Sequence, residues 1–228
     1  MRTNSRTELS SDAPLNADVA PDRLAARLRG IGFVGLLAVA GIYLGSVLIP
    51  GLGALLVLAW AWRSRTPWQE IGLAPPESWM ATIALGIAIG VALRLLMKFA
   101  VLPLLGAPPV NQAFEYLAGN TAALPLAILV MGFVAAFGEE VVMRGFLFER
   151  LIRLLGRSKA SMFFIVLVTS LVFGIGHYPL QGLAGAQNAT LMGLVFGTLY
   201  VLTGRVWLPV AVHSAFNIAG LTMIYLRL

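Results

Sequence analysis

Two adjacent glutamates, Glu139 and Glu140, stand in an otherwise apolar stretch, and Arg144 follows four residues after the second. Residues four apart share one face of a helix, so Glu140 and Arg144 can form an ion pair that offsets the cost of burying both charges. Neighbouring residues point about 100° apart on a helix, which leaves Glu139 without this partner. An unpaired carboxylate in apolar surroundings suits a general base. The alternative is a structural ion-pair cluster that holds helices together.

The two histidines of the chain also stand in pairs with four-residue spacing. His177 follows Phe173, and His213 precedes Asn217. The second pair presents a ring nitrogen and an amide to one point, and both groups can donate to a developing oxyanion. Histidine can also bind a metal ion. The alternative for each of these polar residues is a hydrogen bond that joins two helices.

The composition indicates that the protein containing these residues is a membrane protein. Of 228 residues, 59% are hydrophobic and 11% are charged, whereas soluble domains average about 45–50% and 25%. This excludes a soluble enzyme, a disordered chain and a fibrous repeat, and it predicts an all-α polytopic helix bundle. The absence of cysteine excludes disulfides, thiolate metal sites and a cysteine nucleophile. The basic residues lie between apolar segments, so the net charge of +6 indicates membrane orientation and not nucleic-acid binding.

The chain divides into a polar tail, residues 1–28, which we expect to be flexible, and an integral membrane domain, residues 29–228. The domain contains seven apolar segments that we expect to be membrane spans, and an eighth, broken or re-entrant segment stays open. The segments are 31–49, 52–62, 80–104, 121–148, 160–178, 183–203 and 206–226. Pro50 and Gly51 mark either a turn between the first two segments or a kink in one long helix.

The distribution of basic residues favours the turn and predicts the orientation. If the first two segments form a hairpin, twelve basic residues lie on one side and only Arg227 on the other, whereas one kinked span splits them seven to six. The twelve are Arg2, Arg6, Arg23, Arg27, Arg29, Arg63, Arg65, Arg150, Arg153, Arg157, Lys159 and Arg205. Because cytoplasmic loops carry the excess of lysine and arginine, we expect a multi-pass protein of the cell membrane, with a cytoplasmic N-terminus and an external C-terminus.

This topology brings the polar residues to similar depths. Glu139 and His177 lie about 17 and 20 residues from a turn near Gly156, so their depths differ by only ~5 Å at 1.5 Å per residue. His213 lies eight residues beyond a second turn, near Gly204, on the same side. We therefore expect the three to meet in the inner half of the bilayer. Arg94, deep in the third segment, should pair with a buried glutamate or with a substrate carboxylate, and the structural partner is the default.

Three motifs resemble one known family. The pattern EExxxR at Glu139, Glu140 and Arg144, the pattern FxxxH ending at His177, and the pattern HxxxN from His213 to Asn217 are intact and in order. They resemble the CPBP family of intramembrane proteases, which includes the type II CAAX prenyl endopeptidases and bacteriocin-processing and immunity proteins. The resemblance covers about residues 120–220, the expected catalytic core.

The resemblance implies hydrolysis of a peptide bond within the membrane by activated water. Glu139 would activate the water with the help of His177, Glu140 and Arg144 would form a supporting pair, and His213 with Asn217 would stabilise the oxyanion. Alternatively, His177, His213 and Glu139 form an adequate Zn²⁺ ligand set. We favour the chemistry that requires no metal cofactor, because the His–Asn pair suits an oxyanion equally well.

The implied partners are the lipid bilayer and a peptide or protein substrate, such as a prenylated C-terminus or a leader peptide; no nucleic acid is implied. Two other classes of function bury similar residues. A proton-coupled transporter also places Glu, His and Arg inside the membrane. A non-catalytic scaffold or immunity protein is the second alternative.

Overall fold

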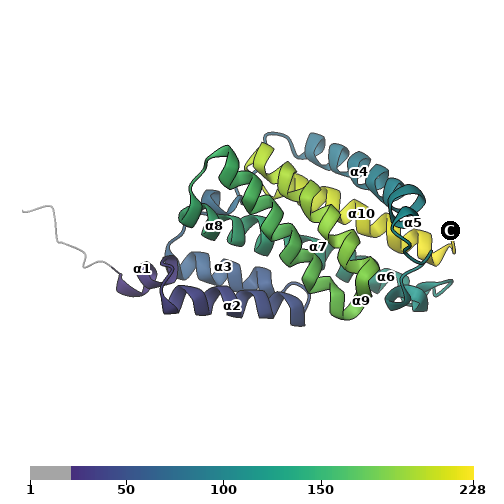
Figure 1. Cartoon of the computed structure of the whole chain (residues 1–228), viewed down its shortest axis with the longest axis horizontal. Helices are drawn as coiled ribbons and strands as arrows, with labels where there is room; N and C mark the ends of the chain where they lie inside the picture. The colour runs from purple at the N-terminus through teal and green to yellow at the C-terminus, as the bar shows by residue number, and fades with distance from the viewer. Residues whose placement is uncertain (1–21) are drawn as a thin grey trace, which may run out of the picture.

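The computed structural model describes residues 22–228, and every regular element within them is helical. Figure 1 shows an elongated bundle, which confirms the predicted all-α fold. The elements in chain order are α1 (Arg23–Arg29), α2 (Phe33–Leu48), α3 (Leu52–Ser64), η1 (Trp68–Ile71), α4 (Trp79–Leu96), η2 (Met97–Val101), α5 (Leu102–Leu104), η3 (Gln112–Leu117), α6 (Leu124–Ala127), η4 (Ile128–Ala135), α7 (Ala136–Glu140), η5 (Val141–Leu147), α8 (Phe148–Leu155), α9 (Lys159–Thr203) and α10 (Trp207–Tyr225).

Helices α2 and α3 form the expected hairpin. Gly51 has a φ of 81°, a left-handed conformation that glycine adopts without strain, and it reverses the chain between the two helices. After the turn, Leu56 packs against Gly45, and Gly53 packs against Ser46. These cross-contacts run antiparallel, so the alternative of one long kinked helix is wrong.

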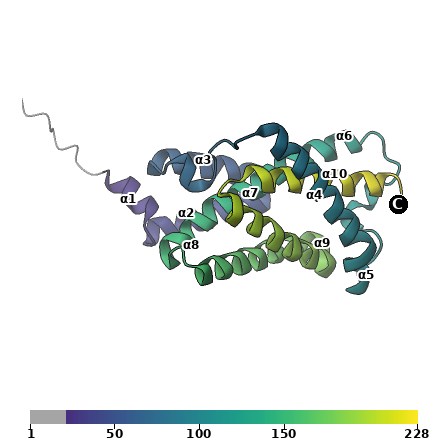
Figure 2. The same cartoon turned by 90° about the horizontal axis from the view of Figure 1, so that it is seen from above.

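Helix α9, which spans 45 residues, is also a hairpin made of two helical arms. The break is Gly182, whose φ of 65° and ψ of −165° are not helical. On either side of it, Gly174 packs against Thr190, and Gly193 packs against Ser170. The two arms therefore lie antiparallel, as Figure 2 shows, and they correspond to the predicted segments 160–178 and 183–203.

Helices α4 and α10 pack in parallel at a close crossing. A Cβ atom at Gly86 would lie 2.3 Å from the Cβ of Ala211, and one at Gly90 would lie 2.7 Å from the Cβ of Ala215. Two glycines four residues apart form a smooth face that lets backbones approach in membrane bundles. This crossing fixes the last turns of α4 against the second half of α10.

All seven predicted segments coincide with helices, but their number of membrane crossings stays a prediction. Within residues 22–228, four helices are long and apolar enough to cross a membrane, when the α9 hairpin is counted once. The α1–α2 pair, bent by 61°, makes a fifth if taken as one span, and α3 is shorter. The fourth predicted segment, 121–148, is too short, since helix continues to Leu155. Large apolar side chains such as Phe33, Met80 and Leu180 face outward, as lipid contact requires.

The residues that join α1 to the bundle correct the predicted tail. Residues 23–28, expected to be flexible, form most of α1, because Asp22 caps the helix by accepting from the Ala25 N–H at 3.0 Å. Asp22 also forms an ion pair with Arg63 at 3.0 Å. The rest of the predicted tail, residues 1–21, lies outside the described residues.

The basic residues gather at one end of the bundle. Arg29 and Arg65 lie together there, Arg150 donates to the carbonyl of Arg29, and Arg153 pairs with Glu70. Figure 1 places α1 and α8 at this end and the C-terminus at the opposite end. Among residues 22–228, these basic side chains lie at the end opposite the C-terminus, as predicted, whereas the orientation of the protein in a membrane stays a prediction.

Candidate active site

The helix that carries both glutamates is irregular on either side of them. Helix α7 holds only five residues, and π-helical turns precede and follow it, η4 and η5. Such i→i+5 turns are rare and are frequent at functional sites, because they change the direction of the side chains around them. Gly138 brings α7 against the α2–α3 turn, where its Cβ position lies 3.1 Å from the Cα of Gly51. The α2–α3 turn therefore packs against the helix that carries the two carboxylates.

Glu140 and Arg144 form the predicted ion pair. The Arg144 Nη1 donates to Oε1 of Glu140 at 2.9 Å, and both side chains are fully buried. The Arg144 Nη2 donates to the carbonyl of Gly193 on α9 at 3.1 Å. His213 of α10 places its Nδ1 2.8 Å from the same Glu140 oxygen. One carboxylate thus ties together three helical elements, as a buried charge requires.

Aromatic rings enclose this network. The Arg144 guanidinium lies between Phe173 and Phe196, with its Cζ 5.1 and 5.4 Å from their ring centres. Phe196 also stacks on the His213 ring at 4.7 Å. Phe173 belonged to a recognised motif, but Phe196 was not predicted, since nothing in the sequence distinguishes it from the other phenylalanines of the chain.

Glu139 points toward open space. Its Oε2 lies 3.7 Å from Nε2 of His213, and its side chain, 27% exposed, lines a cavity of about 820 Å³. Because Nδ1 of His213 faces the Glu140 carboxylate, that nitrogen carries a proton, and Nε2 either accepts from a ligand or, in the charged ring, donates. A carboxylate and an imidazole therefore face a space that can hold water and substrate.

His177 and Asn217 reach the same cavity from two other directions. The Nδ1 of His177 lies 2.9 Å from the carbonyl oxygen of Phe173; a carbonyl only accepts, so Nδ1–H donates and Nε2 is left for the cavity. The Asn217 amide donates one hydrogen to the carbonyl of Met131 at 3.0 Å. The fold thus joins Glu139, Glu140, Arg144 and His213 by contact, and adds His177 and Asn217 through the cavity.

The alternative Zn²⁺ set does not fit this arrangement. Within residues 22–228, no three His, Cys, Asp or Glu side chains lie close enough together to hold a metal ion. Glu139, His177 and His213 therefore do not form such a group in this geometry, and the use of a metal ion stays a prediction. The two rings come from different helices, and each uses Nδ1 in a hydrogen bond within the fold.

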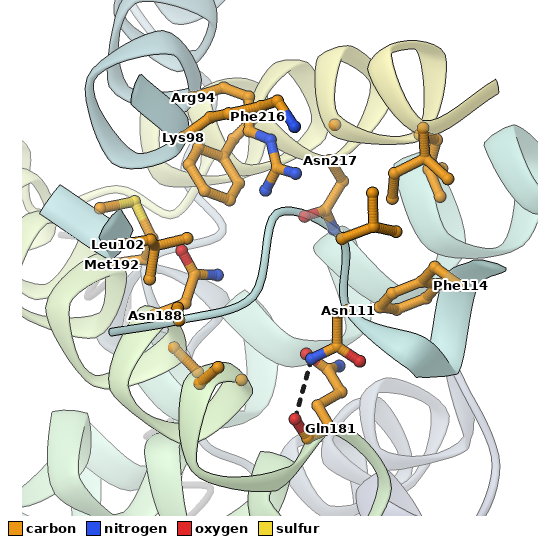
Figure 3. A pocket seen from close by; sticks show the side chains of 18 of the residues that line it. Arg94, Lys98, Leu102, Asn111, Phe114, Gln181, Asn188, Met192, Phe216 and Asn217 are labelled. Atoms are coloured by element: carbon orange, nitrogen blue, oxygen red, sulfur yellow. Dashed lines mark hydrogen bonds between the residues drawn. The ribbon is translucent and has the colours of Figure 1, made fainter. Parts of the chain in front are cut away.

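The cavity extends from Glu139 toward the C-terminal end of the bundle, where the segment 107–111 lies against it. Figure 3 shows this part, with polar side chains from several elements. Asn111 bridges to α9 by donating to the carbonyl of Gln181 at 2.8 Å. Asn188 lines the wall, and its buried Oδ1 has no hydrogen-bond partner in the described part of the chain. These residues were not predicted, although single amides in apolar helices were a usable signal.

Arg94 contradicts an expectation. The structural partner predicted for it, a buried glutamate, is absent: no carboxylate among residues 22–228 pairs with Arg94, and its buried Nε has no hydrogen-bond partner there. Its guanidinium instead lies over the ring of Phe216, 5.3 Å from the centre, and lines the cavity.

Comparison with known proteins identifies the part of the chain that holds the site. Residues 121–219 match the family model described as Type II CAAX prenyl endopeptidase Rce1-like. This match supports the resemblance to the CPBP family that the three motifs carry. The match contains α7, both arms of α9 and most of α10, and therefore every candidate residue from Glu139 to Asn217.

Two curated proteins are similar to part of this chain. YdiL of Bacillus subtilis (strain 168), named as a membrane peptidase, is 36% identical over 95 residues, which cover 42% of this chain and 36% of YdiL. The membrane-embedded CAAX protease MroQ of Staphylococcus aureus (strain USA300) is 23% identical over 150 residues, 65% of this chain and 60% of MroQ. The chain thus spans between about a third and three fifths of these relatives. No solved structure matches it.

Proposed function

We propose that this protein is an intramembrane endopeptidase that hydrolyses a peptide bond with water activated by Glu139. One observation carries the proposal: a partly exposed carboxylate lies 3.7 Å from an imidazole nitrogen at the wall of a large cavity inside an apolar bundle. The match of residues 121–219 to a CAAX prenyl endopeptidase family model and the names of two relatives support a peptidase. The use of glutamate and histidine without a metal is the finer part of the proposal.

The reaction needs one water and one proton carrier. Glu139 accepts a proton from water while the water oxygen bonds to the substrate carbonyl carbon, which places negative charge on the carbonyl oxygen. Asn217 has a second amide hydrogen, not used by Met131, for this oxyanion. His177 offers Nε2 to the same cavity. The proton held by Glu139 then passes to the amine nitrogen as the carbon–nitrogen bond breaks.

Glu140 and Arg144 act through His213 and not on the substrate. Neither side chain lines the cavity, and both are fully buried. Glu140 fixes the tautomer and the orientation of His213, which presents Nε2 to Glu139. We therefore assign the pair as positioning residues. The substrate is a membrane-associated peptide, and a prenylated C-terminus and a leader peptide are the two forms to test first.

The purified full chain, reconstituted with candidate peptides, tests the proposal. Glu139→Ala should lower the cleavage rate about 10²- to 10⁴-fold, as loss of a general base does, with an unchanged thermal transition in detergent. Glu115→Ala is the matched control, because Glu115 also lines the cavity but lies on η3, far along the chain from the proposed site. Equal loss in both variants, or no loss in either, would refute the assignment of Glu139.

Two further arms separate the alternatives. Cleavage should persist in a strong chelator, and loss that Zn²⁺ reverses would overturn the metal-free chemistry. Flux of protons or solute across sealed vesicles that Glu139→Ala abolishes, with no cleavage of any peptide, would instead establish the transporter.

A further inference from the structure

Arg94 is a partly buried cation for which the described residues provide no counter-charge. A charged side chain inside a bilayer is costly, and such residues almost always pair with a neighbour or serve a ligand. No ion pair or hydrogen bond of Arg94 occurs within residues 22–228, and its Nε is buried without a partner. The aromatic face of Phe216 contacts the guanidinium but carries no full negative charge. The remaining role for Arg94 is to bind a ligand.

The packing of α4 against α10 holds this cation at the cavity. Arg94 follows Gly90, the second glycine of the close crossing, by one helical turn, and therefore meets α10 one turn further along. There it meets Gly220, where a Cβ atom would lie only 2.7 Å from the Arg94 Cζ. Figure 3 shows the guanidinium turned into the pocket, near Asn217. The missing side chain at Gly220 thus leaves room for the guanidinium.

The neighbouring polar groups also favour a negative ligand. Lys98 lies one turn beyond Arg94, lines the same cavity, and donates to the carbonyl of Pro109 at 3.1 Å, so its charge is not neutralised either. Two cations four residues apart repel one another in a low-dielectric setting. An anion bound in the cavity beside both side chains would offset this repulsion.

We infer that Arg94 binds the free C-terminal carboxylate of the peptide held in the cavity. The inference rests on the proposed peptidase function of the same cavity. Seven residues of α10 separate His213 from Gly220, about 10 Å at 1.5 Å per residue, so a few extended residues reach from the cleaved bond to the guanidinium. A terminal carboxylate is present in every peptide with a free C-terminus, whatever its sequence, whereas an acidic side chain is present only in some sequences. Arg94 would therefore select substrates cleaved near their C-terminus.

Paired peptides test this assignment without turnover. The probe is a fluorescent apolar peptide with a C-terminal carboxylate, and its twin carries a carboxamide; both bind to full-length Glu139→Ala protein in uncharged detergent. The acid should bind about 10- to 100-fold more tightly than the amide, the range of a charge-assisted hydrogen bond. Adding Arg94→Gln should abolish this preference by weakening only the acid.

Three variants exclude trivial causes. Lys98→Gln removes the same charge one turn away and should keep most of the preference. Arg94→Lys keeps the charge without the two-pronged geometry and should restore part of it. Gly220→Ala leaves the charge in place but forces the guanidinium aside, and should reduce the preference while the thermal transition stays unchanged.

The outcomes distinguish this inference from the proposed function. Equal binding of acid and amide, or equal effects of Arg94→Gln and Lys98→Gln, would overturn the role of Arg94 even if cleavage occurs. An acid preference that depends on Arg94 supports the inference even if no peptide is cleaved. In the cleaving enzyme, Arg94→Gln should raise KM for the acid with little change in kcat. A lipid headgroup is the alternative ligand. If anionic lipid vesicles bind the protein through Arg94 and remove the preference for the acid peptide, the assignment of a peptide carboxylate would be overturned.

Discussion

Two arginines inside this bundle have opposite surroundings. Arg144 donates to Glu140 and to the carbonyl of Gly193, and two aromatic rings enclose it. Arg94 has neither carboxylate nor carbonyl partner within residues 22–228 and rests on one ring at the edge of a cavity. The same side chain is thus neutralised by the fold in one place, where it is fully buried, and left for a ligand in the other, where it is partly buried.

The comparison shows how to separate structural from functional charges inside a membrane. Both arginines stand in apolar segments, and by composition they are equivalent. What distinguishes them is whether the folded chain supplies the counter-charge. A paired cation contributes to stability, so its removal should cost stability. An unpaired cation lowers the stability of the fold, so its presence indicates a function that compensates for the lost stability.

The largest effect is expected at Arg144. Arg144→Gln should lower the free energy of unfolding by about 3–5 kcal/mol, because it leaves the Glu140 carboxylate buried without its partner. Thermal or denaturant unfolding in detergent measures this. The double variant Glu140→Gln with Arg144→Gln should recover part of the loss, since no charge then remains unpaired. An unchanged transition in Arg144→Gln would contradict the structural role of the pair.

A smaller effect of opposite sign is expected at Arg94. Arg94→Gln should leave the free energy of unfolding within about 1 kcal/mol of the parent, on the side of a gain, because the substitution removes a cation without a partner. The same unfolding assay, run beside Arg144→Gln, gives the contrast directly. A loss as large as that of Arg144→Gln would mean that Arg94 is structural and would end its proposed role toward a ligand.

The smallest effect is expected at Asp22, at the end of the bundle that contains α1. The Ala25 N–H and, next, the hydrogen bond from Arg63 hold the pKa of Asp22 below its usual value. A lowered pKa in the folded state stabilises the fold above the unfolded value of about 3.9, and this contribution is lost as the pH falls through the folded pKa. The thermal transitions of the parent and Asp22→Asn should therefore differ slightly at pH 7 and converge in acid. A difference that grows in acid would contradict this sign.

The local parts of the site could be predicted from the sequence. The Glu140–Arg144 pair follows from four-residue spacing, which a helix of nearly any kind converts into contact. The α2–α3 hairpin follows from the distribution of basic residues, because a kinked helix would have split them evenly. The turn inside α9 falls between two predicted segments, at a glycine that can adopt a left-handed conformation.

Other features depended on contacts between residues far apart in the chain. The bond of His213 to Glu140 joins residues 73 positions apart, and Phe196 enters the site only because the second arm of α9 folds back. The π-helical turns around α7 have no recognised sequence signal. The expected Zn²⁺ ligands come from three helical elements, so how closely they approach depends on how these elements pack.

By itself, the sequence determined that this chain is a bundle of apolar helices and which polar side chains must be accommodated among them, since both follow from transfer energies and helical periodicity. Only the tertiary structure decided which of those side chains are neutralised. Pairing between distant helices depends on crossing positions set by small residues such as Gly90, and these crossings left Glu139 and Arg94 facing one cavity.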